Sequence, residues 1–422
     1  MMDQRSPLIS PFKNVWGDSV PPTPFYAYGE KQLTELAEGF EHITTNRVFP
    51  APLHLHFAMK SNHNPHLLKF FKERGIGVDL VSGGELKWAQ RMGFAPEDMV
   101  FSGVGKTDTE LEQALRAGVA MINAESAYEL ERISQLAQKL NCKAFVSLRV
   151  NPDVDAKTHP YISTGLSEHK FGVGMDEAFS LYKKWSSSPH LSWRGVSLHI
   201  GSQLMELEVL GEAIQKVLHF AEELKNAGIR LEVLDVGGGL GVDYKKPNTP
   251  PPFEKYGIVL QMASQAWYEL QGAGAQIYSE CGRALVAQAG YLVTRVIGTK
   301  RNGKKEFALV DASMSELLRP ALYQAWHPVE FWEPSKDVLA RPKKVYDIAG
   351  PVCESSDVIA FARELPELHA GDLLVIGCAG AYGYVMSSTY NARPLPAEWW
   401  ISRDDAAILS RASVDPFATA PL

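Results

Sequence analysis

The chain has few of the features that mark membrane, nucleic-acid-binding or secreted proteins. It has no run rich in Lys or Arg, and its formal net charge is −7, so no extended surface for nucleic acid or anionic lipid is expected. The most apolar stretch, residues 372–381, is too short to span a bilayer. Residues 1–11 contain no apolar run of the signal-peptide type. We therefore expect a cytoplasmic location and no membrane or nucleic-acid partner.

Cysteine is also scarce, and the four cysteines, at positions 142, 281, 353 and 378, are widely separated. No C-x-x-C pair occurs, and no second histidine or carboxylate lies at ligand spacing from His199, so no metal site is expected. A disulfide framework is not expected in a chain of 422 residues. With 45% hydrophobic and 22% charged residues, the composition is that of a globular protein long enough for two domains.

Short apolar runs alternate with segments of helical spacing up to residue 280. The runs predict eight strands, at residues 53–60, 77–82, 99–104, 121–126, 143–151, 194–203, 231–239 and 275–280. Helices are predicted at residues 31–42, 65–74, 84–92, 108–117, 126–140, 205–227 and 256–271. This alternation over about 250 residues is typical of a TIM-type (β/α)8 barrel. A doubly wound open sheet would show the same periodicity.

The pattern changes after residue 280. Residues 282–298, 306–312, 343–349 and 373–378 predict strands, separated by turns rich in Pro and Gly. Residues 25–28, which follow Pro21, Pro22 and Pro24, predict another. We therefore expect a barrel over residues 30–279 and a mostly antiparallel β domain formed by residues 1–29 and 280–422.

The active site of such a barrel lies at the carboxyl ends of its strands. Lys60 is placed there by an apolar run, and partial desolvation would favour the neutral amine that forms imines. Taken alone, a lysine that extends from a strand end into solvent is the simpler explanation. The glycine-rich segment 237–241 could bring backbone N–H groups close to a phosphate, or it could be a tight turn. Val242 replaces the third glycine of a dinucleotide fingerprint, which excludes that motif.

Other polar residues at the strand ends have two explanations each. The ring of His199 could stack on a planar cofactor, or it could be a core histidine. Glu280 could pair with a protonated ring nitrogen, or it could form a structural ion pair with Arg283. Farther along, Arg319 suits a planar carboxylate, and the thiol of Cys353 could donate a proton.

Together these residues form a recognisable series of motifs. In chain order they are FAMKSN, DLVSGGEL, HIGSQ, GGGLG, ECGR, RPALY, CESSD, and GAY followed by SSTYN. The series, from about residue 25 to residue 394, resembles the fold-type III pyridoxal-phosphate decarboxylases, and among them the diaminopimelate decarboxylases. The resemblance implies a barrel and β domain of the alanine racemase-like kind and the cofactor pyridoxal 5′-phosphate. It also implies decarboxylation of meso-2,6-diaminopimelate to L-lysine and CO2, the last step of lysine biosynthesis.

The resemblance also implies residue roles. Lys60 would carry the cofactor, His199 would stack on its ring, and Cys353 would return a proton to the substrate. The cofactor would be bound by Lys60, His199, Ser202, Gly238, Gly239, Glu280, Gly282, Arg283 and Tyr382, and the substrate by Arg283, Arg319, Tyr323, Glu354 and Tyr382. In this family the Cys-Glu segment enters the site from a partner subunit, so a homodimer with shared active sites is implied. Cys281 stands where the family has proline, which puts the rigidity of that loop in doubt.

Several alternatives share most of these motifs. Related decarboxylases act on carboxynorspermidine, D-lysine, D-ornithine, L-ornithine or L-arginine. Two arginines together with Glu354 suit a distal centre with both a carboxylate and an amine, which favours diaminopimelate. A non-catalytic pyridoxal-phosphate-binding homologue would lack the Cys-Glu motif, Lys60 or the second domain, and a racemase would need a tyrosine as proton relay.

Overall fold

The structure, a computed structural model, describes residues 12, 15–16, 19–154, 170–332 and 335–418. Residues 1–11, which the sequence assigned to the β domain, lie outside this range. The chain divides into two units. Of the described residues, those within 39–241 and 252–283 form the barrel unit, and those within 12–38, 242–251 and 284–418 form the sheet unit.

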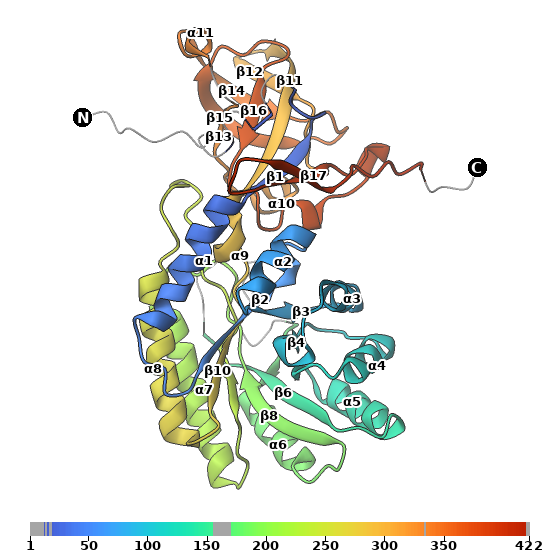
Figure 1. The fold of residues 1–422 in the computed structure, drawn as a ribbon, viewed down its shortest axis with the longest axis vertical. Coiled ribbons are helices and arrows are strands. Elements are labelled where there is room, and N and C mark those ends of the chain that lie inside the picture. The colour runs from blue at the N-terminus through green and yellow to red at the C-terminus, as the bar shows by residue number, and fades with distance from the viewer. Residues whose placement is uncertain (1–11, 13–14, 17–18, 155–169, 333–334, 419–422) are drawn as a thin grey trace. The chain divides into compact units, whose positions relative to one another are not determined.

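The barrel unit has parallel strands with helices around them (Figure 1). Eight of these strands close into a barrel. In the order given below, each strand pairs with the next, and the last strand, β10, pairs with the first, β2. The strands in order are β2 (Leu53–Ala58), β3 (Gly77–Leu80), β4 (Met99–Phe101), β5 (Met121–Ala124), β6 (Ala144–Asn151), β8 (Leu191–Ser197), β9 (Val233–Asp235) and β10 (Gln276–Ser279). This closure confirms the predicted barrel and excludes the open sheet.

The helices of the barrel unit follow the strands, and their starts are set by local side chains. Ser82, Thr107 and Ser126 each accept a hydrogen bond from the backbone N–H three residues on, which begins α3, α4 and α5. The helices are α2 (Pro65–Glu73), α3 (Gly83–Met92), α4 (Asp108–Ala117), α5 (Ala127–Lys139), α6 (Met175–Trp185), α7 (Glu208–Asn226) and α8 (Phe253–Gln271). Among the described residues, no helix is long and apolar enough to cross a membrane.

Helix α6 and the two-residue strand β7 (Val173–Gly174) were not predicted from the sequence. The N-cap of α6 is Gly174, which has no side chain to accept a hydrogen bond, so the usual start signal is missing. Helix α1 (Glu30–Thr45) has residues in both units.

The sheet unit is a mostly antiparallel sheet, as predicted. Its main path runs β15-β14-β12-β11-β1-β17-β18, and β16 pairs with β11 and β13. The strands are β1 (Phe25–Gly29), β11 (Gly290–Asn302), β12 (Lys305–Val310), β13 (Val329–Phe331), β14 (Lys343–Ala349), β15 (Val358–Pro366), β16 (Leu373–Ile376), β17 (Ala397–Ile401) and β18 (Ala407–Arg411). Phe25, Tyr291, Val375 and Ile401 belong to its buried core.

The predicted strand over residues 282–298 is wrong at its start. A helical turn, α9 (Arg283–Val286), and the 3-10 turn η4 (Ala287–Ala289) come first, and the strand begins at Gly290. An apolar run of this length fits either a strand or a buried helical turn. The short helices α10 (Arg319–Tyr323) and α11 (Lys336–Leu339), and the 3-10 turns η5 (Tyr384–Met386) and η6 (Tyr390–Ala392), connect strands of this unit.

Candidate active site

Lys60 lies just beyond strand β2, at the carboxyl end of the barrel. The strand ends at Ala58, and Lys60 belongs to the 3-10 turn η2 (Met59–Ser61), so it does not end the strand as predicted. Ser61 fixes the turn by donating from Oγ to the Ala58 carbonyl at 2.8 Å. Lys60 Nζ donates to Oδ2 of Asp79 at 2.8 Å; the lysine side chain is 34% exposed and Asp79 is fully buried. The amine is thus accessible and held by a buried carboxylate.

Two further buried carboxylates, Asp235 and Glu280, meet at the ends of β9 and β10. Asn123 Nδ2 donates to Asp235 Oδ2 at 2.9 Å and to Glu280 Oε1 at 3.2 Å. Ser102 Oγ donates to the same Glu280 oxygen at 3.0 Å. Burial raises the pKa of Asp235 to about 6. Burial, followed by the charges of Asp235 and Asp79, raises the pKa of Glu280 well above its usual value. A cation beside this pair would favour its ionised form.

His199 follows strand β8 and is neutral. Its Nδ1 accepts the backbone N–H of Gly238 at 3.2 Å, so that nitrogen carries no proton. Burial, with smaller effects from the positive charges of Arg149 and Lys60, holds the pKa of the imidazole well below its usual value. The ring therefore offers an uncharged face.

The glycines of segment 237–241 are needed for close backbone packing. Gly239 has φ +104°, and a Cβ there would lie 2.3 Å from the Gly201 carbonyl oxygen. A Cβ on Gly238 would lie 2.0 Å from the Glu280 carbonyl oxygen. Side chains are excluded at both positions, so the backbone of this segment packs closely at this end of the barrel, where the Gly238 N–H donates to His199.

Ser202, Gly282 and Arg283 lie beside the same loops. Arg283 Nε donates to the Ser202 carbonyl oxygen at 2.8 Å. A Cβ on Gly282 would lie 2.8 Å from Ser61 Oγ, so glycine is also required beside the Lys60 turn. These contacts join the loops that follow β2, β8 and β10.

Cys281 is buried in this loop. Its Sγ is 3.7 Å from the Tyr256 hydroxyl and 3.6 Å from Ser279 Oγ. Burial raises the pKa of the thiol to about 11, so the reactive thiolate is disfavoured. The Cys281 carbonyl accepts the Ala58 N–H at 3.1 Å, which ties this loop to β2.

The remaining predicted residues belong to the sheet unit, which is described by itself. Arg319 is buried at the start of α10 and Tyr323 is half-buried at its end. Tyr382 has a φ of +55°, in the left-handed region that a tyrosine rarely adopts. Cys353 and Glu354 are exposed on one loop.

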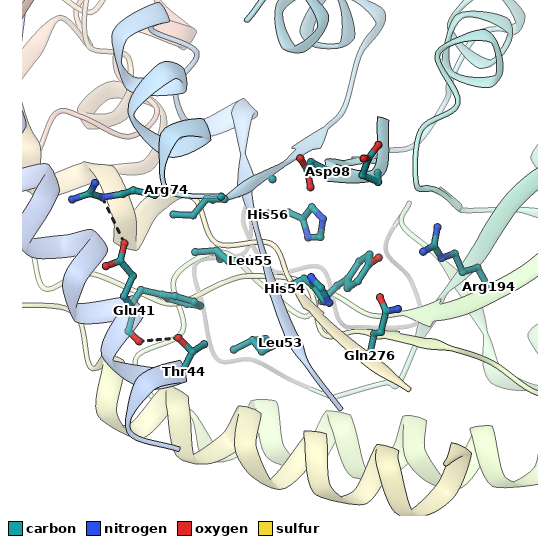
Figure 2. Close-up of a pocket in the computed structure, with 16 residues that line it drawn as sticks. Glu41, Thr44, Leu53, His54, Leu55, His56, Arg74, Asp98, Arg194 and Gln276 are labelled. Atoms are coloured by element: carbon teal, nitrogen blue, oxygen red, sulfur yellow. Dashed lines mark hydrogen bonds and ion pairs between the residues drawn. The ribbon is translucent and has the colours of Figure 1, made fainter. Parts of the chain in front are cut away.

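A cavity of about 370 Å³ opens at the other end of the barrel strands (Figure 2). Its lining includes the starts of β2, β3 and β10 and an ion pair between Arg74 and Glu41, whose Nε and Oε1 are 3.6 Å apart. His56 lines it as a buried neutral base, because burial lowers its pKa to about 3. None of the predicted site residues lines this cavity, and active sites of this fold lie at the carboxyl ends.

The sequence placed Asp79 and Asn123 among the polar residues at the strand ends, but no role was predicted for them, nor for Asp235 and Ser102. A usable signal was present, because each is a polar residue within or directly after an otherwise apolar strand. Their side-chain partners, however, lie 19 to 178 positions away along the chain, and only the closed barrel brings them together.

Comparison with known proteins agrees with this geometry. The sequence profile of the family "Pyridoxal-dependent decarboxylase, pyridoxal binding domain" matches residues 38–287. Diaminopimelate decarboxylase of Aquifex aeolicus is 40% identical over 92% of this chain and 89% of the relative, and that of Pseudomonas aeruginosa is 46% identical over 81% and 80%. The chain belongs to the diaminopimelate decarboxylase family. The crystal structure of the Helicobacter pylori diaminopimelate decarboxylase complexed with L-lysine has a TM-score of 0.85 and 40% identity, covering 94% of this chain and 95% of that one.

Membership of the diaminopimelate decarboxylases confirms the family, the pyridoxal 5′-phosphate cofactor and the carboxy-lyase class predicted from the motifs. The matched pyridoxal-binding region includes every predicted cofactor residue except Tyr382. The residue roles are proposals, developed next.

Proposed function

We propose that the chain decarboxylates meso-2,6-diaminopimelate to L-lysine and CO2 with pyridoxal 5′-phosphate bound at the carboxyl end of its barrel. The observation that carries the proposal is the arrangement at that end. An accessible lysine amine, a neutral histidine ring, a glycine-lined backbone surface and a buried acid pair come from neighbouring strand ends. The sequence likeness to diaminopimelate decarboxylases supports the choice of substrate.

The donor set fits this cofactor. Gly238 and Gly239, with Ser202, Gly282 and Arg283, would hold the phosphate, since the absence of Cβ atoms lets the backbone of these loops approach it. Glu280 would bond the ring nitrogen. Because the pKa values of Glu280 and Asp235 are raised, a positive charge on that nitrogen would stabilise the ionised form of the pair. His199 would stack on the ring as a neutral imidazole, and Tyr382 would contact it as well.

The bound cofactor supplies an electron sink for the pair of electrons left when CO2 departs. The protein supplies orientation and proton control. Lys60 would hold the cofactor by its amine, and when the amine is free it donates a hydrogen bond to Asp79. Asn123 and Ser102 fix the carboxylate of Glu280 toward the site by donating to one of its oxygens. The thiol of Cys353 would return a proton to the substrate Cα.

Specificity would depend on the distal end of the substrate. Arg283, Arg319 and Tyr323 would bind the carboxylate that is retained, because guanidinium groups hold carboxylates through paired hydrogen bonds. Glu354 would bind the distal amine, and Tyr382 would contact the substrate. Substrates with a distal cation alone, such as ornithine, would leave the arginines without an anion, and this costs binding energy.

Steady-state assays test the substrate. We expect kcat/KM for meso-diaminopimelate to exceed those for L-ornithine, L-arginine and D-lysine by at least about 10³-fold, because unpaired buried charges reject the analogues. Faster turnover of any of the last three would contradict the proposal. Arg319→Ala should lower kcat/KM for diaminopimelate about 100-fold and leave the absorbance band of the bound cofactor unchanged.

The proposal includes a homodimer with shared active sites and a cytoplasmic location. Cys353 and Glu354 are exposed, yet their loop is held in place: Asp357 Oδ2 accepts the Val352 N–H at 2.8 Å. An ordered loop with an exposed thiol and carboxylate suits a group supplied to another subunit. The four cysteines are free, as is usual in a reducing compartment.

A further inference from the structure

Arg319 is held by a side chain that has no part in the reaction proposed so far. His327 is completely buried. Its Nε2 lies 2.8 Å from Nη1 of Arg319, and its Nδ1 lies 3.0 Å from the carbonyl oxygen of Gly377. A carbonyl oxygen only accepts, so Nδ1 carries the proton; a guanidinium only donates, so Nε2 is the acceptor. The two contacts therefore select one neutral tautomer of His327.

The backbone around His327 is fixed on both sides. Gly377 N–H donates to the Pro328 carbonyl at 2.9 Å, next to the antiparallel pairing of β13 with β16. Arg363 Nη2 donates to the His327 carbonyl at 3.0 Å. The imidazole is thus anchored to the sheet and not to the short helix that carries Arg319.

A tyrosine holds the face of the same guanidinium. Arg319 Cζ lies 4.5 Å from the ring centroid of Tyr244, and the Tyr244 ring is 5.2 Å from the His327 ring at an angle of 71°. The hydrogen bond from Nη1 fixes the guanidinium within its plane, and the aromatic ring fixes the tilt of that plane.

We propose that His327 is a positioning residue that orients Arg319 toward the substrate carboxylate that the reaction retains. The inference rests on the proposed function. Because the product is L-lysine, this carboxylate belongs to the L centre and is present in both substrate and product. A neutral acceptor orients the guanidinium and leaves its charge available for that carboxylate, whereas Asp or Glu at position 327 would cancel the charge.

The experiment compares the wild-type holoenzyme with His327→Phe, His327→Asn and His327→Gln. His327→Phe keeps an aromatic ring and loses both hydrogen bonds. His327→Asn keeps an N–H donor for the Gly377 carbonyl but is too short to reach Arg319. His327→Gln is longer and places an amide oxygen near Arg319. KM and kcat for meso-diaminopimelate are measured, together with inhibition constants for L-lysine and 1,5-diaminopentane, which differ only by the retained carboxylate.

We expect Phe and Asn each to raise KM for diaminopimelate about tenfold, with kcat changed less than about threefold, because the interaction binds ground state and transition state alike. The inhibition constant of L-lysine should rise about tenfold and that of 1,5-diaminopentane should stay the same. Gln should restore most of the loss.

The outcomes separate this inference from the proposed function. If wild-type enzyme does not decarboxylate diaminopimelate, the proposed function fails before any variant is considered. If wild-type enzyme is active and Asn weakens both inhibitors equally, or neither, His327 has no role specific to the carboxylate and the inference is wrong. Asn decides the question even where Phe does not fold.

Discussion

Asp235 and Glu280 are two buried carboxyl groups at the strand ends, and their burial affects both stability and cofactor binding. Two carboxyl groups are buried side by side, and Asn123 and Ser102 donate hydrogen bonds to the pair. Burial raises the pKa of each, so the protein without cofactor keeps a proton on the pair. A positively charged ring nitrogen of the bound cofactor would stabilise the ionised pair in place of that proton. Cofactor binding and ionisation of the pair are therefore linked.

Asp235→Asn tests this link through the pH dependence of stability. The folded-state pKa of Asp235, about 6, lies above the ordinary 3.8, so the folded protein binds more protons than the unfolded chain between these values. The stabilisation is complete below 3.8 and is lost as pH rises through 6. Between pH 5 and pH 8 the cofactor-free protein should lose about 1 kcal/mol of stability from this group. Urea unfolding at both pH values should show a smaller loss in the variant; equal losses would contradict the assignment.

Gly238→Ala tests the glycine surface. The new Cβ would meet the Glu280 carbonyl oxygen at 2.0 Å, so the loop that carries Glu280 must shift. We expect kcat/KM to fall at least about 100-fold, because displacement of a catalytic group by about 1 Å has this effect, and bound cofactor absorbance to decrease. Gly211→Ala in helix α7, where a Cβ meets nothing within 4 Å, is the control and should raise stability by about 0.5–1 kcal/mol. Equal activity in the two variants would argue against the role of Gly238.

At the scale of elements, the sequence predicted best where a local signal sets a boundary. Helix α4 begins and ends where predicted, because Thr107 and Glu110 form a capping box and Gly118 ends the helix with φ +68°. Strand β15 was missed, since Ala362 has a φ of +51° and register shifts interrupt its pairing with β14. The 3-10 turn at Lys60 was also missed. The apolar run of strand β2 continues into this turn, so the sequence pattern predicted a strand up to residue 60.

Asn64→Ala tests whether the start of helix α2 supports the Lys60 turn. Asn64 Oδ1 accepts the His66 N–H at 3.0 Å, and the Asn64 N–H donates to Asn62 Oδ1 at 2.8 Å, directly after the turn. Loss of the cap should lower the free energy of unfolding by about 1 kcal/mol. Thr107→Ala should give a similar loss on α4. Only Asn64→Ala should also weaken cofactor binding, by about fivefold, measured by absorbance titration. Equal cofactor affinity in both variants would show that the cap and the turn are independent.

At the scale of the whole molecule, the alternation of strands and helices predicted the barrel because a parallel strand needs a crossover connection, and helices supply it here. The pairing that closes the barrel, β5 with β6 and β10 with β2, joins segments that periodicity alone cannot match. The residue pattern suggested that the thiol of Cys353 could donate a proton, but it could not show in which subunit. That Cys353 and Glu354 act in the site of a partner subunit was suggested only by the resemblance to a family.

Mixing two inactive variants tests the shared active site. Lys60→Ala removes the cofactor lysine and Cys353→Ala removes the proton donor, so each homodimer should be inactive. If Cys353 acts in the partner's site, a heterodimer has one site with an intact lysine and an intact cysteine. Random 1:1 assembly makes about half of the dimers mixed, so activity should recover to about 25% of wild type. If lysine and cysteine act within one chain, both sites of the heterodimer lack a residue and no activity returns. Subunits are exchanged by unfolding and refolding the mixture, and wild-type enzyme treated in the same way sets the scale.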